Sequence, residues 1–211
     1  MNLRKIWHIF PILIEYGLLI QNFDMLQTIF YLKYLLLFVI GSDYLRLHSK
    51  TLNNLFIYNK LIKPDEYNEI SASTYYFISV YTNLYLGYLY PTFAIYYFIG
   101  LTSLAIGDPM AYLVGTRFPF IRLYNGKTLS GSIGCFMSCI AFNYTTIYMC
   151  HLYRNDMLEH YNKITAEQYF YIACIGAGVS SITELISGKY DNLTIAPLTA
   201  VSMHLSSMLI T

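Results

Sequence analysis

Residues 92–107 read TFAIYYFIGLTSLAIG and carry no charged side chain, and Asp108 and Pro109 follow directly. Uncharged apolar runs of about this length are typical of helices that span a bilayer. Further runs lie on both sides of this one, and Pro91 predicts a tight turn before it. The seven apolar segments are residues 6–21, 25–41, 72–90, 92–107, 130–150, 166–186 and 193–210. The pattern predicts an all-α, polytopic membrane protein with about seven transmembrane helices.

The composition agrees with this fold class. Of the 211 residues, 56% are hydrophobic and 12% are charged, whereas soluble domains average about 25% charged residues. A soluble globule of this length would need more charge to cover its surface, so the composition excludes a soluble enzyme, a disordered chain and a disulfide scaffold. The net charge of +1 gives no basic excess for nucleic-acid binding. We expect one integral-membrane domain over residues 1–211.

Lysine and arginine are distributed unevenly among the connecting segments. With the N-terminus in the cytoplasm, ten of the 13 basic residues lie inside, Arg154 and Lys163 lie outside, and Lys33 lies within a span. The positive-inside rule therefore predicts a cytoplasmic N-terminus and an external C-terminus. The segments 108–129 and 187–192 then face the cytoplasm, together with segment 42–71. The ten inside residues are Arg4, Lys5, Arg46, Lys50, Lys60, Lys63, Arg117, Arg122, Lys127 and Lys189.

The first apolar run begins like a signal peptide but does not continue as one. Glu15 interrupts the run, and no small-residue cleavage site follows before Asp24. We therefore expect a retained first helix that is tilted or half-buried.

Asp108 ends an apolar run, where an unpartnered carboxylate is costly. Basic residues and glycines follow it within about twenty residues, and Gly126-Lys127-Thr128 is among them. One acid with several bases, hydroxyls and glycines is consistent with a site for Mg²⁺ and phosphate. The spacing alone is equally consistent with an ordinary juxtamembrane loop. A P-loop is excluded, because position 121, where its first glycine would stand, is Ile121.

Two further segments place acids on the same predicted side. Glu184 lies near the inner end of the sixth apolar run, and Asp191 precedes the seventh. Either could complete a metal site with Asp108, although Asp191 is equally well explained as a helix N-cap. In segment 42–71 most acids indicate a solvated face, and Glu69 is the exception because it lies closest to the membrane.

Residues 107–132 resemble the CTP-dependent lipid kinases, the family of dolichol kinase, the CTP-using diacylglycerol kinase and phytol kinase. The family pattern reads G-D-x-x-A-x-x-x-G-x-R-[FY], followed by G-K-[ST]-x-x-G-S. The matching residues are Gly107, Asp108, Ala111, Gly115, Arg117, Phe118, Gly126, Lys127, Thr128, Gly131 and Ser132. Residues 4–8, the segment after Glu69 and residues 191–195 are similar to further family elements. Phosphatidate cytidylyltransferases are distant relatives of this family.

The resemblance implies a membrane lipid kinase that transfers the γ-phosphoryl group of CTP, with Mg²⁺, to the hydroxyl of a diacylglycerol or a polyprenol such as dolichol. It implies catalytic roles for Asp108, Lys127 and Glu69. The implied metal ligands are Asp108, Glu184 and Asp191. The implied nucleotide-binding residues are Gly107, Gly115, Arg117, Gly126, Thr128, Gly131, Ser132 and Asn192.

Three departures from the family pattern leave alternatives open. Ser130 stands where the family often has glutamate, Pro119 where it usually has glycine, and Ala196 separates the last motif from Pro197. The missing glutamate keeps a catalytically degenerate subunit of a larger membrane assembly as an alternative. A phosphatidate cytidylyltransferase is the other. The host membrane is bacterial cytoplasmic, endoplasmic-reticulum or organellar, and the sequence does not choose among them.

Overall fold

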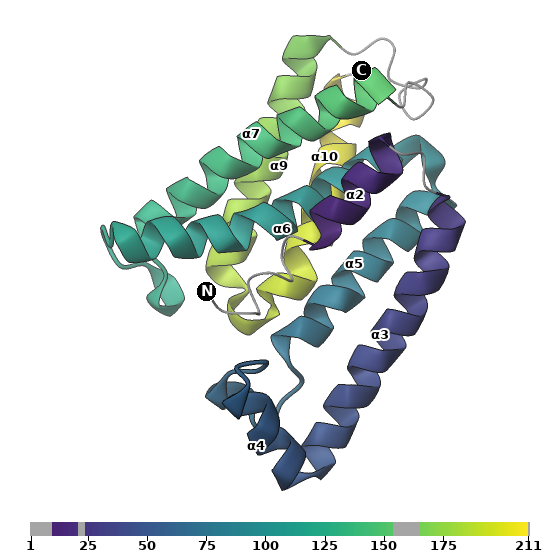
Figure 1. Cartoon of the computed structure of the whole chain (residues 1–211). Coiled ribbons are helices and arrows are strands. Elements are labelled where there is room, and N and C mark those ends of the chain that lie inside the picture. The colour runs from purple at the N-terminus through teal and green to yellow at the C-terminus, as the bar shows by residue number, and fades with distance from the viewer. Residues whose placement is uncertain (1–9, 21–23, 154–164, 211) are drawn as a thin grey trace.

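The computed structural model describes residues 10–20, 24–153 and 165–210 (Figure 1). Within these ranges the regular structure is helical, apart from one isolated antiparallel bridge between Arg122 and Thr128. The helices are α2 (Phe10–Ile20), α3 (Met25–His48), α4 (Lys50–Tyr58), α5 (Ala72–Leu89), α6 (Ala94–Arg117), α7 (Leu129–Tyr153), α9 (Ala166–Ile186) and α10 (Asp191–Ile210). Short 3₁₀ turns are η1 (Pro64–Glu66), η2 (Pro91–Phe93), η3 (Tyr124–Gly126) and η5 (Gly188–Tyr190).

The predicted all-helical fold is confirmed for the described residues, and each apolar segment contains a helix. Four helices, α3, α6, α7 and α9, are long and apolar enough to cross a membrane. Helix α2 has 11 described residues, and α5 and α10 fall below the apolarity of a candidate span, since polar side chains such as serine and threonine recur along both helices. The four long helices support a membrane protein, whereas seven spans and the orientation stay predictions. The basic residues at positions 4, 5, 154 and 163 lie outside the described residues.

Two helices continue well beyond their apolar runs. Helix α3 ends at His48 rather than at residue 41, and α6 ends at Arg117 rather than at residue 107. The prediction that Asp108 ends its helix was therefore wrong: Asp108 lies inside α6, and Pro109 follows it within the same helix. Residues 110–117 keep the helical backbone because they pack against α7. A change in hydropathy marks the end of an apolar run, not the end of a helix.

Segment 42–71 also holds more structure than its polarity predicts. Its first residues belong to α3, and α4 follows after Ser49, whose side chain caps α4 by accepting the Leu52 N–H at 3.4 Å. A chain turn from Asn59 to Lys63 then leads into η1. Figure 1 shows α4 at the lower end of the molecule, below α5 and beside the end of α3.

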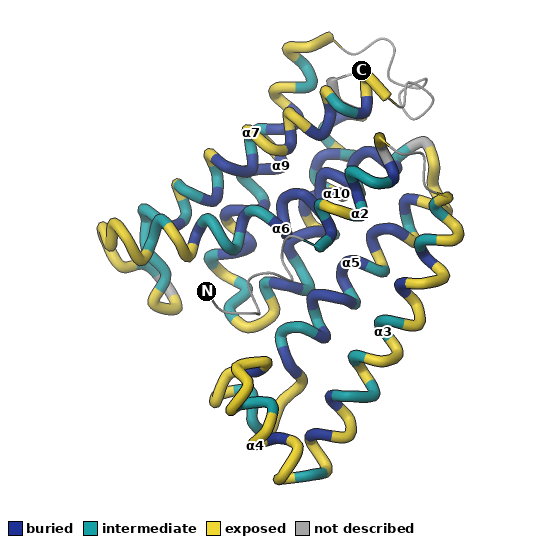
Figure 2. The backbone as a smooth tube through the Cα atoms, viewed as in Figure 1, coloured by how far each residue is buried: buried dark blue, intermediate teal, exposed yellow. Residues whose placement is uncertain are grey.

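Helix α6 lies at the centre of the bundle and contacts α5, α7, α9 and α10 (Figure 2). Small residues allow the close crossings. A Cβ atom on Gly100 would lie 2.4 Å from the carbonyl oxygen of Ala196 in α10. A Cβ on Gly134 would lie 2.7 Å from the Val114 side chain. Close approach of this kind is characteristic of helix packing in membranes, where small residues line the interfaces.

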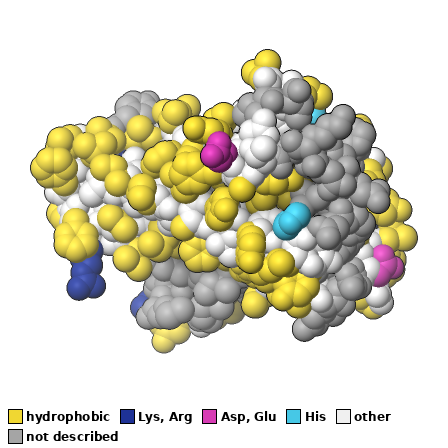
Figure 3. Space-filling view, turned by 90° about the horizontal axis from the view of Figure 1, so that it is seen from above, with side chains coloured by type: hydrophobic (Ala, Val, Ile, Leu, Met, Phe, Trp, Pro, Cys, Tyr) yellow, Lys and Arg dark blue, Asp and Glu magenta, His cyan; other side chains and the backbone are white. Residues whose placement is uncertain are grey.

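The outer surface of the bundle is strongly apolar. Figure 3 shows hydrophobic side chains over most of the described surface in that view, with only isolated charged side chains among them. Helix α3 is the most exposed of the long helices, since it packs on α5 along one face (Figure 2). Its other face presents Phe30, Tyr34, Leu37 and Phe38, each more than half exposed. A surface of this kind matches hydrocarbon rather than water.

Glu15 in α2 points into the bundle and is 1% exposed. The Thr102 hydroxyl lies 2.8 Å from both of its carboxyl oxygens, and Thr146 lies 3.0 Å from Thr102. This face of α2 is therefore buried in the bundle, while the expected tilt or half-burial of the first helix in the membrane stays a prediction. An acid inside an apolar bundle needs such polar partners, which α6 and α7 supply.

Candidate functional site

A cavity of about 820 Å³ opens at the end of the bundle where α6 ends and α7 and α10 begin. The last turn of α9 and segment 57–69 close its other sides. Of the 13 residues to which the family resemblance gives catalytic, metal-binding or nucleotide-binding roles, all except Gly107 and Arg117 line this cavity. They are Glu69, Asp108, Gly115, Gly126, Lys127, Thr128, Gly131, Ser132, Glu184, Asp191 and Asn192. The fold therefore joins motifs that are more than 100 residues apart.

Gly107 and Arg117 have other surroundings. Gly107 is buried between helices, and a Cβ there would lie 3.1 Å from Cys135 Sγ and 3.2 Å from Cys139 Sγ. Arg117 is exposed in the last turn of α6, where a cation is favoured by the helix dipole. The structure thus gives Gly107 a packing role and Arg117 a helix-end position, and brings neither to the cavity.

A short hairpin delivers Lys127 to the cavity. The Leu123 N–H donates to the Lys127 carbonyl at 2.7 Å, and the Leu129 N–H donates to the Ile121 carbonyl at 2.9 Å. Asn125 and Gly126 turn the chain with positive φ angles of 55° and 72°, a conformation that asparagine and glycine tolerate best. Gly126 therefore serves the turn that positions its neighbour.

Ser130 closes this hairpin at its base. Its hydroxyl donates to the Phe118 carbonyl and lies 3.4 Å from the Phe120 N–H, which it accepts. Ser130 does not line the cavity. Ser130, which stands where the lipid-kinase pattern often has glutamate, thus tethers the backbone of the hairpin.

Lys127 is the centre of the site's charge cluster. Its ammonium group forms an ion pair with Glu184 at the end of α9, and a second one with Asp191 Oδ2 at 3.5 Å. Burial of the ammonium lowers the pKa of Lys127, but attraction to Glu184, and then to Asp191 and Asp108, outweighs it, so the net pKa is raised. Lys127 therefore stays protonated, with two carboxylates paired to its ammonium group and a third, Asp108, acting on it electrostatically.

Asp191 is a second member of this cluster, and its pKa is raised. Burial and the neighbouring charge of Asp108 raise the pKa of Asp191 to about 6, although Lys127 opposes the shift. Asp191 also begins α10, and its Oδ1 accepts the Asn192 N–H at 2.8 Å. Asp191 is thus the first residue of α10 rather than the residue before it, which is where an N-cap would stand. Its proposed role as a metal ligand stays a prediction.

The chemistry of these side chains fits Mg²⁺, but their arrangement is not a preformed metal site. Within the described ranges no group of three or more histidine, cysteine, aspartate or glutamate side chains is arranged to hold a metal ion. The Lys127 ammonium pairs with both Glu184 and Asp191. Binding of Mg²⁺ by these two carboxylates would therefore require Lys127 to move to another anion.

Two buried polar atoms at the cavity have no partner among the described residues. They are the Ser132 hydroxyl and the Asn192 Oδ1, and Asn192 is 4% exposed. The Asn192 side-chain N–H donates to the Ala72 carbonyl at 3.2 Å. This hydrogen bond fixes the side chain and leaves Asn192 Oδ1 to accept a further hydrogen bond. Buried acceptors without a donor are uncommon, because each costs free energy. A ligand with N–H or O–H groups would satisfy them.

Gly115 and Gly131 line the cavity for a reason of packing. A Cβ on Gly115 would lie 2.6 Å from Thr128 Oγ1, and one on Gly131 would lie 2.8 Å from the Ala111 carbonyl oxygen. Thr128 Oγ1 accepts the Gly131 N–H at 3.1 Å. These two glycines therefore let α6 and α7 cross closely beneath the cavity, whether or not they also approach a nucleotide.

Replacing Gly131 with alanine should lower the free energy of unfolding by about 1–3 kcal/mol, because the new methyl group overlaps a backbone carbonyl that cannot turn away. Thermal unfolding in detergent measures the change. Gly178→Ala is the matched control: it is also inside a helix, and its Cβ would meet nothing closer than 3.9 Å, so it should be neutral or stabilising. Equal behaviour of the two variants would contradict the packing role.

Sequence reasoning missed the second wall of the cavity. Lys60, Lys63 and Lys189 line it, although the sequence analysis used them only to predict topology. Lys189 Nζ pairs with Glu69 Oε2 at 2.8 Å, which links the α9–α10 turn to segment 57–69 across the mouth. Each lysine reaches the cavity through a chain reversal after a helix, which residue spacing does not reveal.

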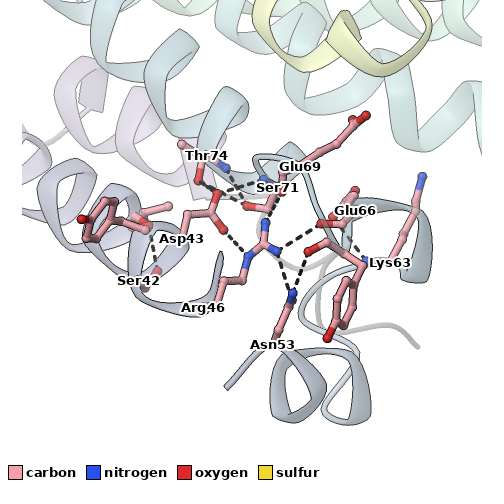
Figure 4. Close-up of polar contacts among 12 residues, drawn as sticks. Ser42, Asp43, Arg46, Asn53, Lys63, Glu66, Glu69, Ser71 and Thr74 are labelled. Carbon is pink, nitrogen blue, oxygen red and sulfur yellow. Dashed lines mark hydrogen bonds and ion pairs between the residues drawn. The ribbon is translucent and has the colours of Figure 1, made fainter. Parts of the chain in front are cut away.

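Sequence reasoning also missed the buried network that holds this wall (Figure 4). Arg46 is fully buried and donates to Asp43 Oδ1 at 2.6 Å and to Asn53 Oδ1 at 3.2 Å. It also donates to the backbone carbonyls of Glu66, at 3.1 Å, and Glu69. Figure 4 shows the guanidinium group among these acceptors, between α3 and the segment that leads to α5.

Asp43 and Asn53 extend the network at either end. Asp43 Oδ2 accepts the Ser71 N–H at 2.8 Å and the Thr74 hydroxyl at 2.6 Å. The Asn53 amide donates to the Tyr67 carbonyl at 2.6 Å. The network thus ties α3, α4 and the start of α5 together, and it fixes the backbone that carries Glu69.

The raised pKa of Asp191 predicts a pH-dependent stability. The folded protein binds a proton at Asp191 more tightly than the unfolded chain does, so this stabilisation is complete below about pH 4 and is lost as the pH rises through about 6. The Asp191→Asn variant has no carboxylate to titrate, so its stability does not fall in this pH range for that reason. Its free energy of unfolding, relative to that of the wild type, should therefore increase by about 1–3 kcal/mol between pH 4 and pH 7. Thermal unfolding at both pH values measures the difference. A difference that stays constant with pH would contradict the shift.

Comparison of the chain with protein-family models, with curated proteins and with solved structures finds no match. The motif residues and their position in the cavity are therefore the observations that bear on function.

Proposed function

We propose that this protein is a membrane lipid kinase that transfers the γ-phosphoryl group of CTP to the hydroxyl of a diacylglycerol or a polyprenol. The observation that carries the proposal is the convergence of separate motifs on one cavity: Glu69, Asp108, residues 126–132, Glu184 and residues 191–192 all line it. Residues that resemble a family pattern by chance have no reason to meet at one place in the fold.

The charge cluster supplies the groups that phosphoryl transfer needs. Asp108, Glu184 and Asp191 would hold Mg²⁺, which neutralises the charge of the nucleotide phosphates when it is bound. Lys127 is already protonated at the centre of the cluster, and a phosphate would compete with Glu184 and Asp191 for its ammonium group. The unpartnered Asn192 Oδ1 and Ser132 hydroxyl offer hydrogen-bond partners to the nucleotide.

The surroundings suit a lipid acceptor. Ile57, Ile62, Pro109 and Tyr112 line the same cavity as the charged residues, and Tyr112 is 55% exposed on the outer face of α6. A lipid hydroxyl could therefore approach along an apolar path while its chains stay in the bilayer. In the transfer, the hydroxyl oxygen bonds to the γ-phosphorus, the bond to the bridging oxygen breaks, and CDP leaves. Glu69 or Asp108 would accept the hydroxyl proton.

The alternatives predict different products from one experiment. Purified protein is incubated with labelled CTP, Mg²⁺ and a panel of diacylglycerol, dolichol, phytol and phosphatidate. Release of CDP with a phosphorylated lipid supports the kinase, whereas release of pyrophosphate with CMP on the lipid supports a cytidylyltransferase. A parallel reaction with ATP should be slower, and equal use of ATP would contradict the family assignment. Neither product, with no nucleotide binding and stable co-purifying membrane proteins, would support a structural subunit.

The structural-subunit alternative has one observation in its favour. Lys127 pairs with two of the three proposed metal ligands. If this pairing were permanent, Mg²⁺ would not enter, and titration with Mg²⁺ and CTP would leave the thermal stability unchanged. We expect stabilisation instead, because a ligand that binds only the folded state raises its stability.

A further inference from the structure

Helix α4 presents an apolar stripe outward. Leu52, Leu55 and Tyr58 recur at every third residue and are 38%, 51% and 83% exposed. The opposite face carries Asn53, which is 3% exposed and is held by Arg46 and by the Tyr67 carbonyl. The buried network therefore fixes which face of α4 points outward. An exposed apolar stripe on a short helix beside the ends of membrane helices is typical of an element in the interface between headgroups and acyl chains.

Two lysines follow this stripe directly. Lys60 and Lys63 are exposed and line the cavity mouth. The other two lysines of the cavity are committed, Lys127 to Glu184 and Asp191, and Lys189 to Glu69. Within the described part of the chain no ion pair involves Lys60 or Lys63. These two ammonium groups are therefore available to an anion that arrives from outside.

The acids of the same segment do not neutralise the two lysines. Glu66 Oε2 accepts the backbone N–H of Lys63 at 3.3 Å and so caps η1. Glu69 is paired with Lys189 at 2.8 Å. Asp65 contributes the remaining negative charge of the segment, so its removal should strengthen binding of an anion here.

Lys60 occupies a backbone position that favours glycine. Its φ angle is 58°. Its N–H donates to the Ile57 carbonyl at 2.9 Å, and the Leu61 N–H donates to the Phe56 carbonyl at 2.9 Å. This is the hydrogen-bond pattern with which helices end on a left-handed residue, and glycine is the residue usually found there. The fold would accept glycine at position 60, so the lysine side chain contributes something that helix termination does not need.

We propose that Lys60 and Lys63 bind the phosphate of an anionic phospholipid whose acyl chains lie along Leu52, Leu55 and Tyr58. The apolar stripe contacts the acyl chains of the lipid. The ammonium groups of Lys60 and Lys63, which have no ion-pair partner among the described residues, pair with the phosphate of its headgroup. The subsite requires a lipid phosphate but no phosphoryl transfer, so it is independent of the proposed kinase activity. In a kinase it would hold the phosphorylated product as that product leaves the cavity.

The test compares binding of short-chain phosphatidate, short-chain phosphatidylcholine and inorganic phosphate to the purified full chain at constant ionic strength. Thermal shift and native mass spectrometry report binding without nucleotide. We expect phosphatidate to bind in preference to the other two. Lys60→Gly and Lys63→Gln should each weaken phosphatidate binding by about five- to tenfold. Lys60→Gly should at the same time leave the thermal midpoint unchanged or higher, which separates loss of binding from loss of folding.

Lys50→Gln is the matched control, because Lys50 is exposed at the other end of α4 and does not line the cavity. Its phosphatidate affinity should match that of the wild type, and Asp65→Asn should bind more tightly. The proposal is overturned if Lys60→Gly binds phosphatidate as well as the wild type does, or if Lys50→Gln loses as much affinity. It is also overturned if inorganic phosphate binds equally well. Failure of the CTP assay would leave all of these expectations unchanged.

Discussion

Replacing Asp108 with asparagine should lower the rate of phosphoryl transfer from CTP by about a hundredfold or more, while folding and membrane insertion stay intact. Asparagine keeps the size of the side chain but removes the charge that a cation needs. The charge of Asp108 acts on both Lys127 and Asp191, so its loss alters the whole cluster. Removing one of three neighbouring negative charges also relieves repulsion, and the thermal midpoint should stay equal or rise.

Two measurements on one preparation decide this prediction: specific activity per folded molecule, and thermal stability in detergent. Glu167→Gln provides the control, because Glu167 lies in the first turn of α9, at the opposite end of the helix from Glu184. The control should match the wild type in both measurements. If Asp108 instead serves only as a structural partner for a basic side chain, Asp108→Asn will lose stability and keep its specific activity. That result would remove Asp108 from the catalytic assignment.

The sequence predicted the helices better than it predicted their ends. Hydropathy identifies residues 92–107 as a span and predicts that it ends there, because the charged Asp108 follows. The helix nevertheless continues to Arg117, since its packing against α7 outweighs Asp108 and Pro109. This continuation places Asp108 on the cavity side of α6 instead of in a loop. The functional role of Asp108 stays a prediction, and the correction to the helix length leaves it unchanged, because Asp108 lines the cavity.

The grouping of the candidate site residues was predictable where these residues lie near the ends of predicted spans. Positive-inside counting placed the segments that carry Lys127, Glu184 and Asp191 on one side, and the fold brings these residues together. It was not predictable where a residue's role depends on a neighbour distant in sequence. Gly115 and Gly131 resemble nucleotide-binding glycines in sequence, but each also has a packing contact that only the crossing of α6 and α7 reveals.

The same limit applies to Arg46, which the sequence analysis counted only as a cytoplasmic positive charge. Its acceptors come from positions 43, 53, 66 and 69, and the last two are backbone carbonyls, which every residue carries. No pattern of side chains marks such acceptors in advance. Burial of a charge with this many partners could be recognised only from the fold.

Replacing Arg46 with alanine should cost about 3–5 kcal/mol of stability, because the Asp43 carboxylate would remain buried without its cation. Arg46→Lys should recover only part of the loss. An ammonium group could reach Asp43 but not also hold Asn53 and two backbone carbonyls in the planar geometry of a guanidinium group. Thermal and denaturant-induced unfolding in detergent measure both changes. Lys33→Ala, on the same helix at an exposed position, should be nearly neutral.

A double variant separates loss of the charge pair from loss of the anchor. Asp43→Asn/Arg46→Gln leaves no unpaired buried charge, so it should be more stable than Arg46→Ala. It still lacks the donors that hold the Glu66 and Glu69 carbonyls, so segment 60–71 should exchange its amide hydrogens faster than in the wild type. Because this segment carries Lys60, Lys63 and Glu69, the double variant should also bind ligands more weakly in the cavity. Normal exchange and normal ligand binding would show that the network stabilises the fold without positioning the cavity wall.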